Sequence, residues 1–160
     1  MSIGNPPPRT GPPPQVAPRD PAVRKQDVLA LLATERHVWL SSASGDRPHL
    51  VPLAYVWDGV ELTLATRAGT RTARNLRASG WARAALGTTR DVVMLQGPVS
   101  FTDPATATEG ELARFGGLPI DPARVPGMLG LHLRPERIQA WRAMSEIPQR
   151  ALMVEGRWLA

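Results

Sequence analysis

Apolar and polar residues alternate along most of the chain after residue 36, and this pattern predicts β-strands. A two-residue period is typical of a strand with one buried face. The segment PHLVPLAYVWD (48–58) predicts one long strand, in which Pro52 indicates an edge or a bulge because proline donates no ladder hydrogen bond. The other strands are predicted at residues 37–42, 60–66, 81–88, 92–101, 128–134 and 136–142, with a short hairpin about Glu155-Gly156.

Capping residues and helical spacing predict three helices. Asp, Thr and Pro are favoured where helices begin, and Gly where they end. The predicted helices cover residues 23–35 after Asp20-Pro21, residues 70–79 between Thr70 and Gly80, and residues 103–115 from Asp103-Pro104 to Gly116-Gly117.

The order of these elements predicts an antiparallel, mainly β fold. Short turns join neighbouring strands, and no βαβ rhythm is present. Six or seven such strands with a few short helices are typical of a closed or split β-barrel. A β-bulge is expected at Gly97-Pro98.

The first 22 residues differ from the rest of the chain. Eight of the 17 prolines lie within the first 21 positions, where large apolar residues are almost absent. Such a segment cannot bury enough surface to offset its chain entropy, so residues 1–22 are interpreted as a disordered tail and residues 23–160 as one domain. The tail has no apolar signal core, and no apolar window reaches the ~20 residues of a membrane span, so we expect a cytoplasmic protein.

Several classes of chemistry are excluded by residue content. The chain has no cysteine, and its three histidines (His37, His49 and His132) lack metal-ligand spacing, so no metal site is expected. Nucleophile-elbow, Rossmann and P-loop motifs are absent, and the acidic residues are scattered. Catalytic residues therefore stay unassigned, and a bound cofactor is expected to carry any chemistry.

Positive charge is concentrated in one segment. Residues 62–90 contain six arginines and no acid, although the whole chain has a net charge of only +5. Such a segment suits an anionic partner: a phosphate, an acidic tail or a nucleic acid. An arginine-rich composition is equally expected from a GC-rich genome, in which case it carries no functional meaning.

The junction between the predicted strand 60–66 and the helix 70–79 is the candidate site. A helix start offers free N–H groups and the positive end of the helix dipole. Thr70 adds a hydroxyl, and Arg67, Arg71 and Arg74 can converge there, as in a phosphate cradle. The alternative is an ordinary capped amphipathic helix with solvated arginines. His49, in a strand, is either structural or catalytic.

The run from His37 to Phe101 resembles the pyridoxamine 5′-phosphate oxidase-like superfamily of flavin and deazaflavin oxidoreductases. The matching stretches are DRPHLVPLAYVWDG, LTLATRAGTRTARNL and VVMLQGPVSF. The segments RIQAWR and EGRWL resemble actinobacterial members. The resemblance extends over residues 24–158.

This resemblance implies a six-stranded antiparallel split β-barrel of the FMN-binding type, assembled as a homodimer with cofactor sites at the subunit interface. Family members often carry a lysine where this chain has Arg71 or Thr72, and arginine contacts phosphate with a different geometry. The implied cofactor-binding residues are His49, Leu50, Val51, Pro52 and Leu53 for the ring, Ala65, Thr66, Thr70, Arg71, Thr72 and Arg74 for the phosphate, and Trp141 and Arg142 from the partner.

The function implied by the resemblance is hydride transfer between FMN or coenzyme F-420 and a small molecule. The alternative is a non-catalytic protein that binds flavin, deazaflavin, haem or another tetrapyrrole, which suits the small set of acid–base residues. A nucleic-acid binder that uses residues 67–83 is disfavoured, because few aromatic residues interleave with these arginines.

Overall fold

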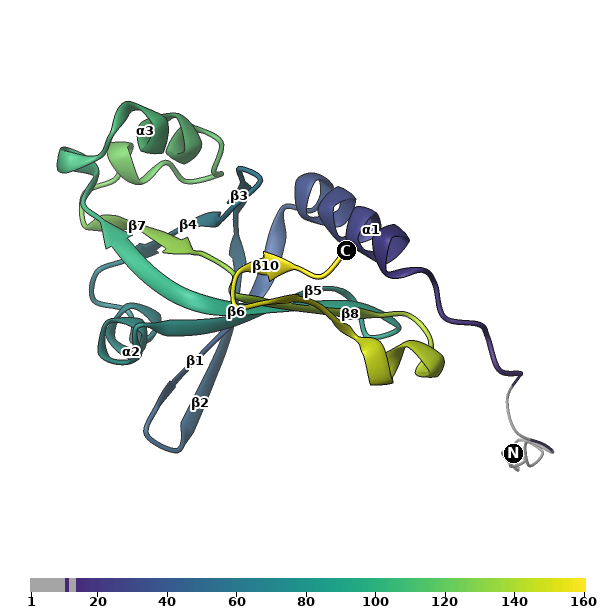
Figure 1. The fold of residues 1–160 in the computed structure, drawn as a ribbon. Helices are drawn as coiled ribbons and strands as arrows, with labels where there is room; N and C mark the ends of the chain where they lie inside the picture. The colour runs from purple at the N-terminus through teal and green to yellow at the C-terminus, as the bar shows by residue number, and fades with distance from the viewer. Residues whose placement is uncertain (1–10, 12–13) are drawn as a thin grey trace, which may run out of the picture.

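The computed structural model describes residues 11 and 14–160, which form a mainly β protein with a few short helices (Figure 1). None of the helices in this part of the chain has the length and apolarity that a membrane crossing requires. The helices are α1 (Pro21–Thr34), α2 (Arg71–Ser79), α3 (Glu109–Gly116) and the 3-10 helices η1 (Pro104–Thr106), η2 (Pro122–Arg124) and η3 (Met144–Gln149). The strands are β1 (His37–Ser44), β2 (Arg47–Ala54), β3 (Val56–Trp57), β4 (Leu62–Arg67), β5 (Trp81–Thr88), β6 (Asp91–Thr102), β7 (Met128–Leu133), β8 (Arg137–Trp141), β9 (Ala151–Val154) and β10 (Arg157–Trp158).

The strands form a split antiparallel β-barrel, as the sequence predicts. The order β8-β6-β5-β1-β2 makes one side, and β4 and β7 make the other. The long strand β6 belongs to both sides, since Gln96 pairs with Arg137 of β8 whereas Val99 pairs with Leu133 of β7. Strands β2 and β4 contact each other without pairing, and this seam splits the barrel.

Leucines from both sides of the barrel fill one core. Leu40, Leu64, Leu95 and Leu131 are each at most 1% exposed. Leu32 of α1 and Leu76 of α2 join the same cluster, so the two helices cover its ends. Burial of this apolar face, together with the Thr70 cap, fixes α2 beside β1.

Two predicted elements are interrupted in the structure. The single strand expected over residues 48–58 breaks at Tyr55, whose N–H donates to the Arg36 carbonyl and whose hydroxyl donates to the Leu32 carbonyl at 2.9 Å. Burial raises the pKa of this phenol to about 12. The helix expected over residues 103–115 is divided into η1 and α3, because Thr108 and Glu111 form a capping box that starts a new helix.

The bulge expected at Gly97-Pro98 is wrong. The register between β5 and β6 runs without a shift from Trp81 opposite Pro98 to Thr88 opposite Asp91. Gly97 is needed for a different reason: a Cβ at this position would collide with the Arg134 carbonyl oxygen. This close approach occurs where β6 passes from β8 to β7.

The boundary predicted for the proline-rich tail falls inside α1, which begins at Pro21 behind the Asp20 cap. Arg19, also in the predicted tail, donates to the buried Glu146 carboxylate through Nε at 2.8 Å and Nη2 at 3.0 Å. Its Nη1 pairs with Asp27 at 2.6 Å. The segment before α1 is therefore fastened to the barrel at residue 19. The expected disorder of residues 1–10 and 12–13 lies outside the described residues.

Candidate anion and cofactor site

The loop between β4 and α2 is closed by two threonine hydroxyls. Thr70 Oγ1 accepts a hydrogen bond from the Ala73 N–H at 3.1 Å and donates to the Arg67 carbonyl at 3.0 Å. The Thr66 hydroxyl lies 2.9 Å from the Thr70 hydroxyl oxygen. Thr70 is thus the N-cap that the sequence predicts, and Thr66 is buried directly beneath it.

The first turn of α2 presents donors that have no internal acceptor. Ala73 N–H donates to the Thr70 hydroxyl and Arg74 N–H to the Thr70 carbonyl. Within the described part of the chain, the amides of Arg71 and Thr72 have no such partner. Free amides at the positive end of a helix dipole are suited to an anion.

Arginine side chains surround this helix start. Arg67, Arg71 and Arg74 are exposed, whereas Ala73 and Leu76 are fully buried on the opposite face of α2, as the spacing predicts. Among the described residues, no carboxylate forms an ion pair with any of the six arginines of segment 62–90. The positive charge at this end of α2 is therefore not neutralised within the chain.

Two arginines of α2 turn back toward the loop that precedes the helix. Arg74 Nη1 donates to the Gly69 carbonyl at 2.5 Å, and Arg77 Nη1 donates to the Ala68 carbonyl at 3.2 Å. The Arg77 guanidinium also lies 5.3 Å from the centroid of the Phe101 ring. Arg71 makes no such contact with the described residues, so among the arginines of α2 its guanidinium is the one left available to a ligand.

Strand β2 offers a free backbone edge beside this loop. Among the strands of the described residues it pairs only with β1, which confirms the edge position that Pro52 predicts. The Tyr55 N–H donates to the Arg36 carbonyl. Because backbone groups alternate in direction along an antiparallel strand, the N–H and carbonyl groups of the odd-numbered residues of β2 point toward β1. The groups on the free edge are the N–H of Leu50 and Ala54 and the carbonyls of Pro48, Leu50, Pro52 and Ala54.

Side chains join β1 and β2 to α2. His49 Nε2 lies 3.2 Å from the Thr72 hydroxyl, and Asn75 Nδ2 donates to the Ser42 hydroxyl at 3.2 Å. Ser42 and His49 are opposite each other in the β1–β2 register. The structure thereby brings the β2 and α2 parts of the predicted site together at one end of the barrel.

Trp141 and Arg142 are not part of this cluster within one chain. They lie where β8 ends, on the side of the barrel away from α2 (Figure 1). Arg142 pairs there with Asp91 at 3.0 Å. Any contribution from these two residues has to come from a second subunit.

Sequence reasoning missed Ser42, Asn75 and Arg77. A signal for Asn75 exists, because it lies three residues after Thr72 and is a polar residue on the apolar face of α2. No comparable signal identifies Ser42 or Arg77, since their roles depend on strand register and on the path of the loop.

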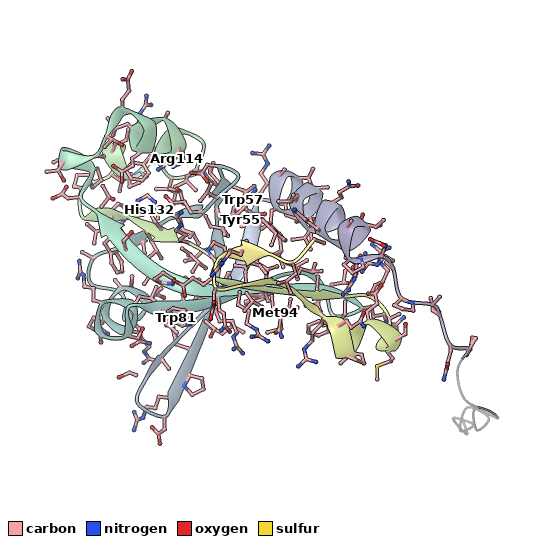
Figure 2. All side chains as sticks on the ribbon, viewed as in Figure 1. Tyr55, Trp57, Trp81, Met94, Arg114 and His132 are labelled. Atoms are coloured by element: carbon pink, nitrogen blue, oxygen red, sulfur yellow. The ribbon has the colours of Figure 1, made fainter. Side chains whose placement is uncertain are left out.

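A separate polar cluster lies beneath α3, and Figure 2 shows two of its members, Arg114 and His132. The His132 ring, 4% exposed, lies 3.0 Å from the Thr102 hydroxyl and 3.5 Å from Glu111. Hydrogen bonds from the Thr108 N–H and then from Thr102 hold the pKa of Glu111 below its ordinary value. The described residues contain no group of acids and histidines that could hold a metal ion. The cluster fastens α3 to the barrel, because Thr102 of β6 donates to Glu111 and Arg114 donates to Thr63 of β4.

The outer face of the β2-β1-β5-β6 sheet carries an exposed apolar row beside the polar row of Ser41, Arg83 and Gln96. Pro52, Trp39, Ala85 and Met94 form one cross-strand row, and Trp39 is 51% exposed. Trp81, 41% exposed, lies on the same face as Met94 (Figure 2). A depression of about 380 Å³ between this face and the end of α1 is lined by Trp39 and Pro52. Exposed apolar surface of this kind is typical of a protein interface.

Solved structures share this fold at low sequence identity. A Listeria innocua protein designated a pyridoxamine 5′-phosphate oxidase is 18% identical, with a TM-score of 0.61 over 74% of this chain and 98% of its own. An F420 reductase is 20% identical, with a TM-score of 0.54 over 68% of this chain and 93% of its own. An FMN-binding protein of Nostoc punctiforme is 15% identical, with a TM-score of 0.52 over 74% and 78%.

A search of curated proteins gave no match. The family described as pyridoxamine 5′-phosphate oxidase matches residues 25–142, which include β1, β2, the loop before α2 and the end of β8. The resemblance drawn from the sequence is confirmed over most of the chain. This protein therefore belongs to the pyridoxamine 5′-phosphate oxidase family.

Proposed function

We propose that the protein is a homodimeric oxidoreductase that binds FMN or coenzyme F-420 and exchanges hydride with a small molecule. The observation that carries the proposal is the start of α2, where free amides, a hydroxyl and arginines without ion pairs meet the free edge of β2. FMN and coenzyme F-420 both combine a phosphate with a flat polar ring, so they require these two features side by side.

The α2 end of the site suits the phosphate. The amides of Arg71 and Thr72 and the Arg71 guanidinium are free to donate, and Thr66 and Thr70 hold the loop in place. An arginine and helix amides together provide charge-assisted hydrogen bonds to the oxygens of a phosphate. These residues would bind the anionic part of the cofactor.

The β2 edge suits the ring. The Leu50 N–H and the neighbouring carbonyls can meet the acceptors and donors of a heterocycle, and Val51 supplies apolar surface. Bound flavin or deazaflavin supplies the hydride chemistry. The chain's own part is to orient the ring, keep water from one of its faces and neutralise its phosphate.

The exposed apolar row on the sheet supports the homodimer in this proposal. Packing of two copies through the surface around Trp39, Trp81 and Met94 would bury exposed indole and thioether groups. It would also let Trp141 and Arg142 of the partner subunit approach a site that they cannot reach within one chain.

The second candidate is a protein that binds the same cofactor without catalysis. It is favoured by the scarcity of proton-transfer groups, since His49 is the one histidine or acid among the residues that the structure brings together at the α2 site. In that case the same contacts would serve storage or delivery of the cofactor.

Spectra and titrations test the proposal and separate the two candidates. The absorbance spectrum and mass of any co-purifying molecule are measured first, followed by titration with FMN and with coenzyme F-420. The loaded protein is then mixed with NADPH or reduced coenzyme F-420 and candidate acceptors. Turnover supports the oxidoreductase, tight binding without turnover supports the second candidate, and no binding of either cofactor contradicts both.

A further inference from the structure

The loop before α2 is held by two arginine side chains of that helix. Arg74 and Arg77 lie three residues apart on α2 and donate to the consecutive carbonyls of Gly69 and Ala68. Both guanidinium groups are thereby engaged with the backbone of the chain. Neither is placed like Arg71, which has no contact of this kind.

These contacts determine the orientation of the peptide groups in the loop. In a trans peptide the C=O and the following N–H point in opposite directions, and the described chain has no cis peptide. Because the Ala68 carbonyl faces Arg77, the Gly69 N–H faces the other way. This N–H has no acceptor among the described residues and adds a third free amide to those of Arg71 and Thr72.

Arg77 is itself held in place from outside the helix. Its guanidinium lies 5.3 Å from the Phe101 ring centroid, and Phe101 is a half-buried residue of β6. The contact connects the loop conformation to the strand that both sides of the barrel share. A cation above an aromatic face is attracted by the ring quadrupole, which limits the freedom of the side chain.

We propose that Arg74 and Arg77 are positioning residues, which orient the Ala68–Thr70 loop by binding its carbonyls, while Arg71 alone among the α2 arginines contacts the anion. The inference rests on the proposed function, since it assigns roles within that site. It departs from the sequence-based expectation that Arg74 contacts the phosphate directly.

The test compares affinity and salt dependence in single variants of the full chain. The variants are Arg71→Gln, Arg74→Gln, Arg77→Gln, Arg77→Lys and Phe101→Leu, with Arg90→Gln as the control because Arg90 is an exposed arginine of the same segment outside the site. FMN and riboflavin are titrated at several NaCl concentrations, and coenzyme F-420 is titrated in parallel with its phosphate-free deazaflavin alcohol. Melting temperatures show that each variant is folded.

We expect Arg77→Gln and Arg74→Gln to weaken FMN binding about 3- to 10-fold, as for the loss of one positioning hydrogen bond, with riboflavin binding unchanged. The salt dependence of FMN binding should stay as steep as in the wild type, whereas Arg71→Gln should flatten it because a direct ion contact is lost. Arg77→Lys should recover part of the affinity, and Phe101→Leu should lose part of it without any change of charge.

Two results would overturn the inference. Arg77→Gln could flatten the salt dependence as much as Arg71→Gln, which would place Arg77 on the phosphate. It could also behave like Arg90→Gln, which would leave the loop contacts without a role. Failure of the proposed function looks different: the wild type would then bind FMN and coenzyme F-420 no more tightly than their phosphate-free counterparts.

Discussion

His49 on β2 and Thr72 on α2 are joined across the site, with 3.2 Å between the imidazole Nε2 and the threonine hydroxyl. The contact connects the strand proposed to face the ring with the helix proposed to hold the phosphate. The two halves of the site are therefore not independent, and their coupling can be measured.

The first prediction is that His49→Leu and Thr72→Val each weaken FMN binding and that their effects are not additive. Each substitution removes the same hydrogen bond. The loss of binding free energy in the double variant should therefore be smaller than the sum of the two single losses, with a coupling of about 0.5–1.5 kcal/mol. Titration of the four proteins completes the cycle. Strict additivity would mean that the contact does not couple β2 to α2.

The second prediction concerns the ion pair between Arg19 and Glu146. Arg19→Ala leaves the Glu146 carboxylate, 1% exposed, with only backbone donors. We expect a loss of about 2 kcal/mol in the free energy of unfolding, below the ~3–5 kcal/mol of a fully buried pair because Arg19 is partly exposed and water can enter. Urea denaturation measures the loss.

The matched control for Arg19→Ala is Arg157→Ala, whose pair with Glu155 is on the surface, with both side chains at least 80% exposed. This variant should unfold at the wild-type urea concentration. Removal of residues 1–13 should likewise be neutral, whereas removal of residues 1–20 should destabilise the protein like Arg19→Ala. Equal stability of the two truncated proteins would contradict the role of Arg19.

The third prediction is a loss of stability in acid that depends on Glu146. The hydrogen bonds from Arg19 hold the pKa of this carboxyl well below its ordinary value. Its contribution is therefore complete above the unfolded value of about 4.3 and is lost as pH falls toward the lower folded value. Glu146→Gln should flatten the stability between about pH 5 and pH 3. A profile as steep as that of the wild type would assign the acid sensitivity to other carboxyls, such as Glu111.

The fourth prediction is that Gly97→Ala destabilises the barrel by about 3 kcal/mol, because the added methyl group meets the Arg134 carbonyl where backbone cannot yield. Gly116→Ala is the control, since a Cβ there meets no atom within 4 Å. Thermal unfolding of both variants measures the difference. Similar melting temperatures would show that the crossing point of β6 tolerates a side chain.

The fifth prediction concerns the proposed dimer. Trp39→Arg should convert the protein to a monomer and abolish any contribution of Arg142 to cofactor binding, because a charge in the apolar row around Trp39 cannot be buried without a partner. Ile120→Arg is the control, since Ile120 is 55% exposed and lies between α3 and η2, outside the strands of that sheet. Size-exclusion chromatography with light scattering reports the mass, and a wild-type mass for Trp39→Arg would contradict this interface.

Local signals predicted most of the fold. The caps of α1 and α2 and the alternation of β1, β4 and β5 are each read within a few residues of the chain. Errors arose where a distant contact decides the structure. The break at Tyr55 accompanies the bond of its hydroxyl to a carbonyl of α1, and the need for Gly97 depends on Arg134.

The candidate site likewise has features that the local sequence predicts and features that depend on distant contacts. Thr70, Arg71 and the free first turn of α2 follow from sequence, because a helix start is a local feature. The different use of Arg71, Arg74 and Arg77 could not be predicted, since spacing along a helix does not tell where a guanidinium finds a carbonyl.

The prolines of β2 have a consequence for self-association. Of the four residues of this strand that face outward, two are Pro48 and Pro52, which offer no N–H to an incoming strand. A second polypeptide could not form a continuous strand pairing along this edge, so growth into fibrils by strand addition is disfavoured there. A compact molecule that needs only one or two donors is not hindered, and the edge can remain open to it without endangering solubility.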